Sequence, residues 1–154
     1  LSAIYHATAD LVEGVDCGGR DRTAELAVEF WEEVAEHIKE WKQVRDGDLT
    51  AGEVRQDFIH SHGVVLQAIG RVGNMLLREH YEHWKNRLAE LDKIDWRRNN
   101  TGTWEGRALI GGRVSKSQQN VVLTCNAIKN YLGIELTPEE RRVEEAMQRG
   151  DHAA

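Results

Sequence analysis

The sequence predicts an all-α protein, with six or seven helices in one compact helical domain or subdomain. A single proline among 154 residues, with 40% hydrophobic and 30% charged residues, is typical of a compact helical chain rather than a disordered one. Apolar residues recur at helical spacing along most of the chain. A chain of this length can bury a continuous core as a single domain.

The first 45 residues are predicted to form two helices. Ile4, Ala7 and Leu11 recur at helical spacing, which predicts a helix from Leu1 to about Glu13. A glycine-rich turn at residues 16–19 ends it. Residues 21–44 then combine one apolar stripe with one glutamate-rich face, which predicts a single long amphipathic helix whose acidic face is solvated. The stripe consists of Ala27, Phe30, Trp31, Val34, Ile38 and Trp41.

Two further helices are expected in the middle of the chain. Thr50 and Glu53 form a capping box, so a helix should start near Ala51. The run at residues 60–63, His-Ser-His-Gly, should interrupt or bend it, and the next helix should run to about residue 79.

Gly70 and Gly73 lie inside that second helix, where each glycine costs about 1 kcal/mol relative to alanine. We expect them to be there because another backbone approaches closely, and we expect this helix to be the most buried one. A short helix from Tyr81 to about Leu91 should follow.

Residues 92–112 show no clear period and form a long basic loop, which is usually functional when it is not disordered. Trp96 and Trp104 within it argue against disorder. Ser115 followed by Gln118 has the spacing of a capping box and predicts a helix start near Ser115.

Gly133 is a suitable stop for the helix that begins near Ser115, and Thr137, Pro138 and Glu140 predict the start of a last amphipathic helix. The core of the molecule is expected around the helices at residues 64–79 and 116–132.

Several classes of protein are not favoured by the composition. No apolar run approaches the ~20 residues of a membrane span, so no membrane partner is expected. Two cysteines, Cys17 and Cys125, fit a reducing compartment, which favours a cytoplasmic protein. His80 and His83 are one helical turn apart but have no third ligand at a diagnostic spacing, so neither a metal nor another cofactor is expected.

The charge is distributed unevenly, and this distribution suggests a binding surface. The net charge is −6, yet residues 93–131 carry seven Lys and Arg against two Asp and Glu. A helix start presents free N–H groups that favour an anion, and cations beside it would form a phosphate-binding corner. Arginines and tryptophans interleaved in a loop are typical of a surface that contacts a nucleic-acid backbone. The expected DNA-binding residues are Arg97, Arg98, Arg107, Arg113, Ser115, Lys116 and Ser117.

The segments at residues 104–118, 49–55 and 59–63 resemble the C-terminal part of the DndB family, DNA sulfur modification proteins that carry a DGQHR domain. The resemblance implies a bacterial DNA-binding regulator of transcription of a DNA phosphorothioation gene cluster, with no catalytic residue to carry over. The Asp-Gly-Gln-His-Arg motif does not occur here. Because the chain opens without methionine and already in a helical pattern, we expect residues 1–154 to be the helical C-terminal region of a larger protein that carries this motif upstream.

Two other functions remain open from the residues. In the first, the chain is a structural or oligomerisation module, with possible homo-oligomers and with arginines that pair internally. In the second, it is a fragment of an enzyme that acts on nucleic acid or nucleotide, with Cys17 or with His60 and His62. No complete set of acid, base and nucleophile is visible, so enzymatic activity is the less favoured interpretation. The discriminating observation is whether Arg107 and Arg113 are paired with carboxylates in the fold.

Overall fold

The computed structural model describes residues 2–150 and confirms the all-α fold class. The described residues form nine α-helices rather than six or seven: α1 (Ser2–Val12), α2 (Arg20–Glu36), α3 (Lys39–Arg45), α4 (Ala51–Asp57), α5 (Gly63–Glu79), α6 (Trp84–Leu88), α7 (Thr101–Trp104), α8 (Gln118–Leu132) and α9 (Pro138–Gln148). Two 3-10 helices, η1 (Tyr81–His83) and η2 (Ala89–Lys93), flank α6. Strands β1 (Leu109–Ile110) and β2 (Arg113–Val114) pair as a short antiparallel hairpin.

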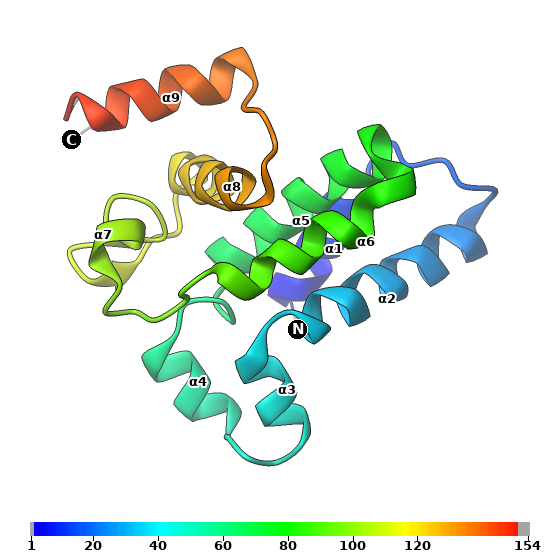
Figure 1. Ribbon diagram of the computed structural model, residues 1–154, viewed down its shortest axis with the longest axis horizontal. Helices are drawn as coiled ribbons and strands as arrows, with labels where there is room; N and C mark the ends of the chain where they lie inside the picture. Colours follow the sequence, from blue (N-terminus) through cyan, green and yellow to red (C-terminus); the bar gives the residue numbers. More distant parts are fainter. Residues whose placement is uncertain (1, 151–154) are drawn as a thin grey trace.

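Helix α5 lies at the centre of the molecule, as Figure 1 shows. It packs most extensively on α1 and on α8, and it also contacts α6, while Phe30 of α2 reaches its Gly73. Four of its inward residues, Val65, Ile69, Val72 and Leu76, are at most 2% exposed. The helices α3 and α4 form a separate corner at the bottom of the view, and α9 extends along the top.

The two glycines of α5 allow close packing, but in different ways. A Cβ at Gly70 would overlap the backbone carbonyl of Ala7 in α1, so the expected approach of another backbone is confirmed there. A Cβ at Gly73 would instead overlap side chains, the ring of Phe30 and a methyl of Leu11. Gly70 therefore sets the distance between α1 and α5.

The prediction of one helix over residues 21–44 was wrong, because the chain breaks between α2 and α3. Ile38 takes an extended conformation (φ −121°, ψ 101°) and is buried. Both ring nitrogens of His37 lie 3.3 Å from carboxylate oxygens, one on Glu33 and one on Asp92. Burying Ile38 at the break turns the chain so that α3 can pack against α4.

The segment at residues 92–112 is not a structureless loop, since it contains the end of η2, α7 and β1. The expectation that the tryptophans keep this segment from being disordered is confirmed. The rings of Trp96 and Trp104 stack with their centroids 5.4 Å apart and are buried in the core. The indole N–H of Trp104 donates to the carbonyl of Asp95 at 2.8 Å. The aromatic pair thus fixes the segment that carries Arg97 and Arg98.

Three of the expected helix boundaries are confirmed. Capping boxes begin α4 at Thr50 and α9 at Thr137, and Gly133 ends α8 in the left-handed conformation with φ 71°. The expected start of α8 at Ser115 is wrong, since the N-cap is Ser117, whose Oγ accepts from the backbone N–H of Asn120 at 3.1 Å. Among the described helices, none is long and apolar enough to cross a membrane.

We predict that Gly70→Ala will lower the free energy of unfolding by about 1–3 kcal/mol, the usual range for overpacking, because its Cβ would displace the Ala7 backbone. Chemical denaturation measures this change. The matched control is Gly52→Ala in α4, where the Cβ would meet only the Thr50 hydroxyl at 3.9 Å and should stabilise the helix slightly. Equal stability of the two variants would contradict the close contact.

Candidate nucleic-acid interface

The structure places the expected DNA-binding residues in different environments. Arg107 is the one whose charge is neutralised inside the protein. Its Nη1 donates to Glu144 Oε1 and to the carbonyl of Leu123, both at 2.8 Å, and its Nη2 lies 2.5 Å from Glu144 Oε2. The Arg107 side chain is 13% exposed. Its guanidinium is turned into the protein and neutralised there, so we leave Arg107 out of the proposed surface.

Arg113 and Lys116 are placed differently. Both are exposed, and among residues 2–150 neither side chain has an assigned ion pair or hydrogen bond. Arg113 lies on β2, and Lys116 lies in the segment between β2 and α8. These two cations are therefore available to a ligand.

The Gly-Gly turn between the strands does not offer its amides to an anion from outside. The backbone N–H groups of Gly111 and Gly112 both donate to the carboxylate of Glu105. Gly111 and Gly112 have φ of 59° and 77°, a conformation that favours glycine. This loop is a turn closed by the protein's own carboxylate.

Ser115 and Ser117 are also used internally, in a network with Asn120. The Ser115 hydroxyl donates to Asn120 Oδ1 at 2.9 Å, and Ser117 caps α8. The Asn120 amide group in turn donates to the carbonyls of Gly106 and Arg107, at 3.2 and 2.7 Å. The two serines therefore hold the start of α8 against the segment before β1, which positions Lys116.

A cleft of about 530 Å³ lies beside this corner and brings together four parts of the chain. It is lined by His6 and Asp10 of α1, Arg55 of α4, Gly63 at the start of α5, and Lys116. Among the side chains that the structure describes, none caps the first amide groups of α5, a helix of 17 residues. The uncapped start of a long helix carries partial positive charge, so it adds to the charges of the cleft's arginine and lysine.

Arg55 also connects the cleft to the arginines of the segment before α7. Its carbonyl accepts from Arg98 Nη2 at 3.2 Å. Arg97 and Arg98 line a second hollow of about 570 Å³ together with Gly112, the residue before Arg113. We call the exposed cations Arg55, Arg97, Arg113 and Lys116 the basic belt. Arg98 stays outside it, because its side chain is partly buried and its Nη2 also lies 3.1 Å from His62 Nε2.

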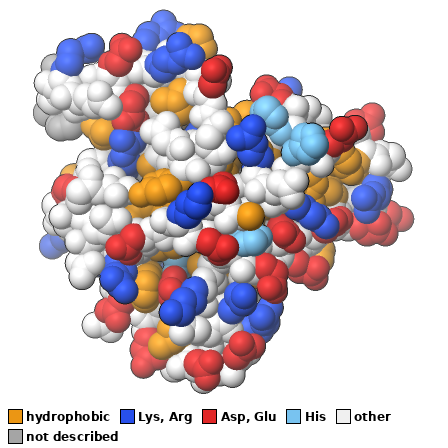
Figure 2. Space-filling model, in the orientation of Figure 1, with side chains coloured by type: hydrophobic (Ala, Val, Ile, Leu, Met, Phe, Trp, Pro, Cys, Tyr) orange, Lys and Arg blue, Asp and Glu red, His pale blue; other side chains and the backbone are white. Residues whose placement is uncertain are grey.

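The carboxylate inside the cleft does not neutralise the belt. Asp10 accepts from Gln67 at 3.3 Å and lies 3.9 Å from Arg71, so it is already balanced by an arginine outside the belt. The surface around the belt is mixed: in Figure 2, acidic and basic side chains alternate over the lower part of the molecule, where α3 and α4 lie.

Arg55 and the start of α5 were not among the expected binding residues. They are more than 40 residues from Lys116 in the sequence and become its neighbours only through the packing of α5 on α8. The sequence did contain one local signal for the start of α5. In the His-Ser-His-Gly run the residue before Gly63 is His62, whose side chain does not cap the helix.

The two histidines of that run have structural surroundings. His60 is fully buried, stacks on Phe58 with ring centroids 5.2 Å apart, and places Nε2 2.8 Å from Glu40 Oε1. Burial lowers the pKa of His60 more than the adjacent Glu40 carboxylate raises it. Burial, with the charges of Arg55 and Arg98, likewise lowers the pKa of His62. Both rings are therefore neutral at neutral pH.

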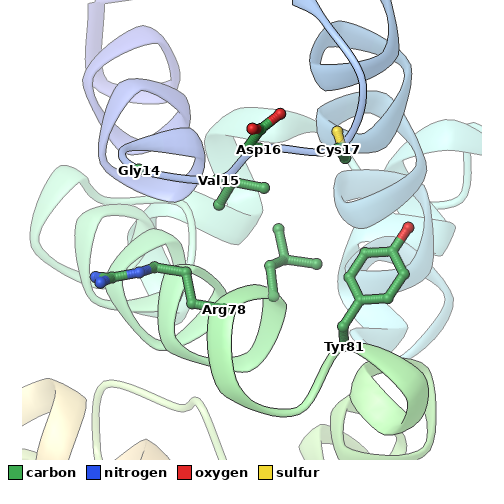
Figure 3. Close-up of a pocket in the computed structure, with 7 residues that line it drawn as sticks. Gly14, Val15, Asp16, Cys17, Arg78 and Tyr81 are labelled. Atoms are coloured by element: carbon green, nitrogen blue, oxygen red, sulfur yellow. The ribbon is translucent and has the colours of Figure 1, made fainter.

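Cys17 lies far from these histidines in the fold, in a hollow between the α1–α2 connection and the end of α5. Figure 3 shows its thiol near Asp16, with the guanidinium of Arg78 pointing away from it. The Sγ of Cys17 lies 3.6 Å from Thr23 Oγ1, and neither His60 nor His62 lines this hollow. The residues named for an enzyme are thus not assembled into one site. No group of three or more potential metal ligands exists in the described part of the chain.

The chain is thus an all-α protein in which several exposed basic side chains gather beside one cleft. Residues 1–135 match the family model described as DndB, DNA-sulfur modification-associated, and the chain therefore belongs to that family. No curated protein and no solved structure matches the chain.

We predict that the stability of the protein falls as the pH is lowered below about 6.5, because the unfolded chain then binds protons at His60 that the folded protein excludes. In His60→Gln, which keeps a donor for Glu40, the loss between pH 7.5 and pH 5.5 should be smaller. Urea denaturation at the two pH values measures it. His83→Gln, at an exposed position, is the control, and an unchanged pH dependence in His60→Gln would refute the assignment.

Proposed function

We propose that this protein is a DNA-binding regulator of transcription of a DNA sulfur modification gene cluster, and that the basic belt contacts the phosphate backbone. The observation that carries the proposal is the convergence of Arg55, Lys116 and the uncapped start of α5 in one cleft. Membership of a family associated with DNA sulfur modification supports DNA as the polyanion.

The chemistry of the belt suits phosphate groups. Lysine offers a point charge, arginine offers a planar set of donors that matches phosphate oxygens, and helix amides add donors without a side chain. Such contacts fix the position of a protein on DNA and carry no base specificity by themselves. The belt therefore accounts for affinity and orientation.

The acidic remainder of the protein restricts where DNA can bind. The net charge is −6, so the protein as a whole repels a polyanion and a local basic surface is needed to bind one. The belt connects the cleft that holds Arg55 and Lys116 with the neighbouring hollow that holds Arg97. DNA is therefore directed to the part of the surface that contains both hollows.

The alternative function, a structural or oligomerisation module, requires that the arginines form ion pairs within the protein. Arg107 pairs with a carboxylate, as that alternative requires, whereas Arg113 is exposed and has no such pair within residues 2–150. The ion pair of Arg107 concerns a residue outside the belt. We therefore favour DNA binding as the function of the belt.

We predict that the double variant Arg55→Ala/Lys116→Ala binds duplex DNA more weakly and with a shallower salt dependence. Each phosphate contact contributes about −0.9 to the slope of log K against log salt, so the slope should become less negative by roughly 2. Fluorescence anisotropy across a salt series measures both quantities, and the loss should be similar for unrelated DNA sequences.

The control is Arg22→Ala, which removes a charge at the start of α2, at the opposite end of the molecule from α4 and α7 in Figure 1. It should leave the slope within experimental error of the parent. A double variant that retains the parental affinity and slope would overturn the proposed function of the belt.

A further inference from the structure

Helix α9 is attached to the rest of the protein mainly through charged groups. Its one buried residue is Glu144, and no apolar side chain of α9 is fully buried. Glu144 binds Arg107, and Glu140 accepts from Lys129 Nζ at 2.7 and 2.8 Å. The apolar side chains Val143, Ala146 and Met147 are only half-buried, so the ion pairs make the most deeply buried contacts of this helix.

The surface under α9 is an anion-binding site formed by three side chains. Arg107, Asn126 and Lys129 converge on the two glutamates, and Asn126 Nδ2 donates to Glu144 Oε1 at 3.1 Å. Asn126 and Lys129 are 0% and 5% exposed.

The packing beside this site is incomplete. A groove of about 770 Å³ lies along the end of α9 and is lined by Ile110, Leu123 and Met147, among others. Ile110 is 52% exposed. The apolar packing at this end of α9 is therefore incomplete.

The site adjoins the basic belt. Asn120, which binds Ser115 and Ser117, donates to the carbonyl of Arg107. Ser117 and Asn120 also line the groove beside α9. The family match ends at residue 135, so the cations of the site lie inside it and the glutamates of α9 lie outside it.

We propose that α9 is a removable acidic cover, and that Arg107, Asn126 and Lys129 form a second phosphate-binding site that DNA occupies when α9 is displaced. This proposal rests on the proposed function, because the ligand of the second site is the same DNA that the belt binds. The carboxylates of Glu140 and Glu144 stand in for backbone phosphates while the cover is closed.

Competition of this kind is physically reasonable. Burying charges has a desolvation cost of several kcal/mol per ion, so the closed cover gains only the difference between the attraction of the ion pairs and this cost. When DNA displaces α9, the two cations exchange carboxylates for phosphates, and the two glutamates return to water. The residues between α8 and α9 begin with Gly133 in the left-handed conformation, a point at which the chain direction already changes.

The test uses full-chain variants that release α9 without removing it. Glu144→Gln removes the charge that Arg107 binds and should make amide hydrogen exchange in α9 about tenfold faster or more, with α5 unchanged. It should also bind duplex DNA more tightly, with a slope of log K against log salt that is steeper by roughly 1 to 2. Adding DNA to the parent protein should accelerate exchange in α9.

Two matched variants separate the site from a general charge effect. Glu145→Gln makes the same charge change at the next, exposed position and should have neither effect on α9 exchange nor the gain in slope. Arg107→Ala/Glu144→Gln also releases α9 but lacks one cation, so it should lose about 1 unit of the slope that Glu144→Gln gains.

The failures of the two proposals differ. If the belt variants weaken DNA binding while Glu144→Gln behaves like Glu145→Gln, the cover is overturned and the belt stands. If DNA leaves α9 exchange unchanged, the cover is also overturned. If neither the parent nor Glu144→Gln binds DNA, the proposed function fails, and the second site loses its ligand.

Discussion

The backbone contact between α1 and α5 at Gly70 is the constraint on which the candidate site depends. It fixes α5 in the core, between α1 and α8, and therefore fixes where its uncapped first turn emerges. That turn meets Arg55 and Lys116 in one cleft. A wider separation of α1 and α5 would move His6 and Asp10 away from the cleft and change its charge.

The aromatic residues behind the belt provide a second constraint. Trp96 stacks on Trp104 and contacts His60 edge-on, and His60 stacks on Phe58. Phe58 and Arg97 are joined by an isolated bridge between their backbones. Rigid aromatic packing thus positions a segment with no long regular structure, so the adjacent arginines are held in place before any ligand binds.

The two arginines that the sequence treats alike, Arg107 and Arg113, have opposite environments. Arg107 faces α9 and is neutralised by Glu144, whereas Arg113 extends from a hairpin into solvent. The difference comes from α9, a helix that lies 30 residues or more beyond Arg107 along the chain. The same pairing explains why α9 is held by charge, and it places a covered cationic site next to an open one.

Local physical chemistry in the sequence determined the helical class, the capping boxes at Thr50 and Thr137 and the stop at Gly133, because these depend on residues within one turn of each other. It also located Arg113 and Lys116 in a basic segment. Other features followed from burial and from distant partners. They are the helix break after Glu36, the folded structure of residues 92–112 and the use of Ser117 as the N-cap of α8. Only the tertiary structure decided which cations meet and which are neutralised, because charge pairing depends on distance in space rather than on separation along the chain.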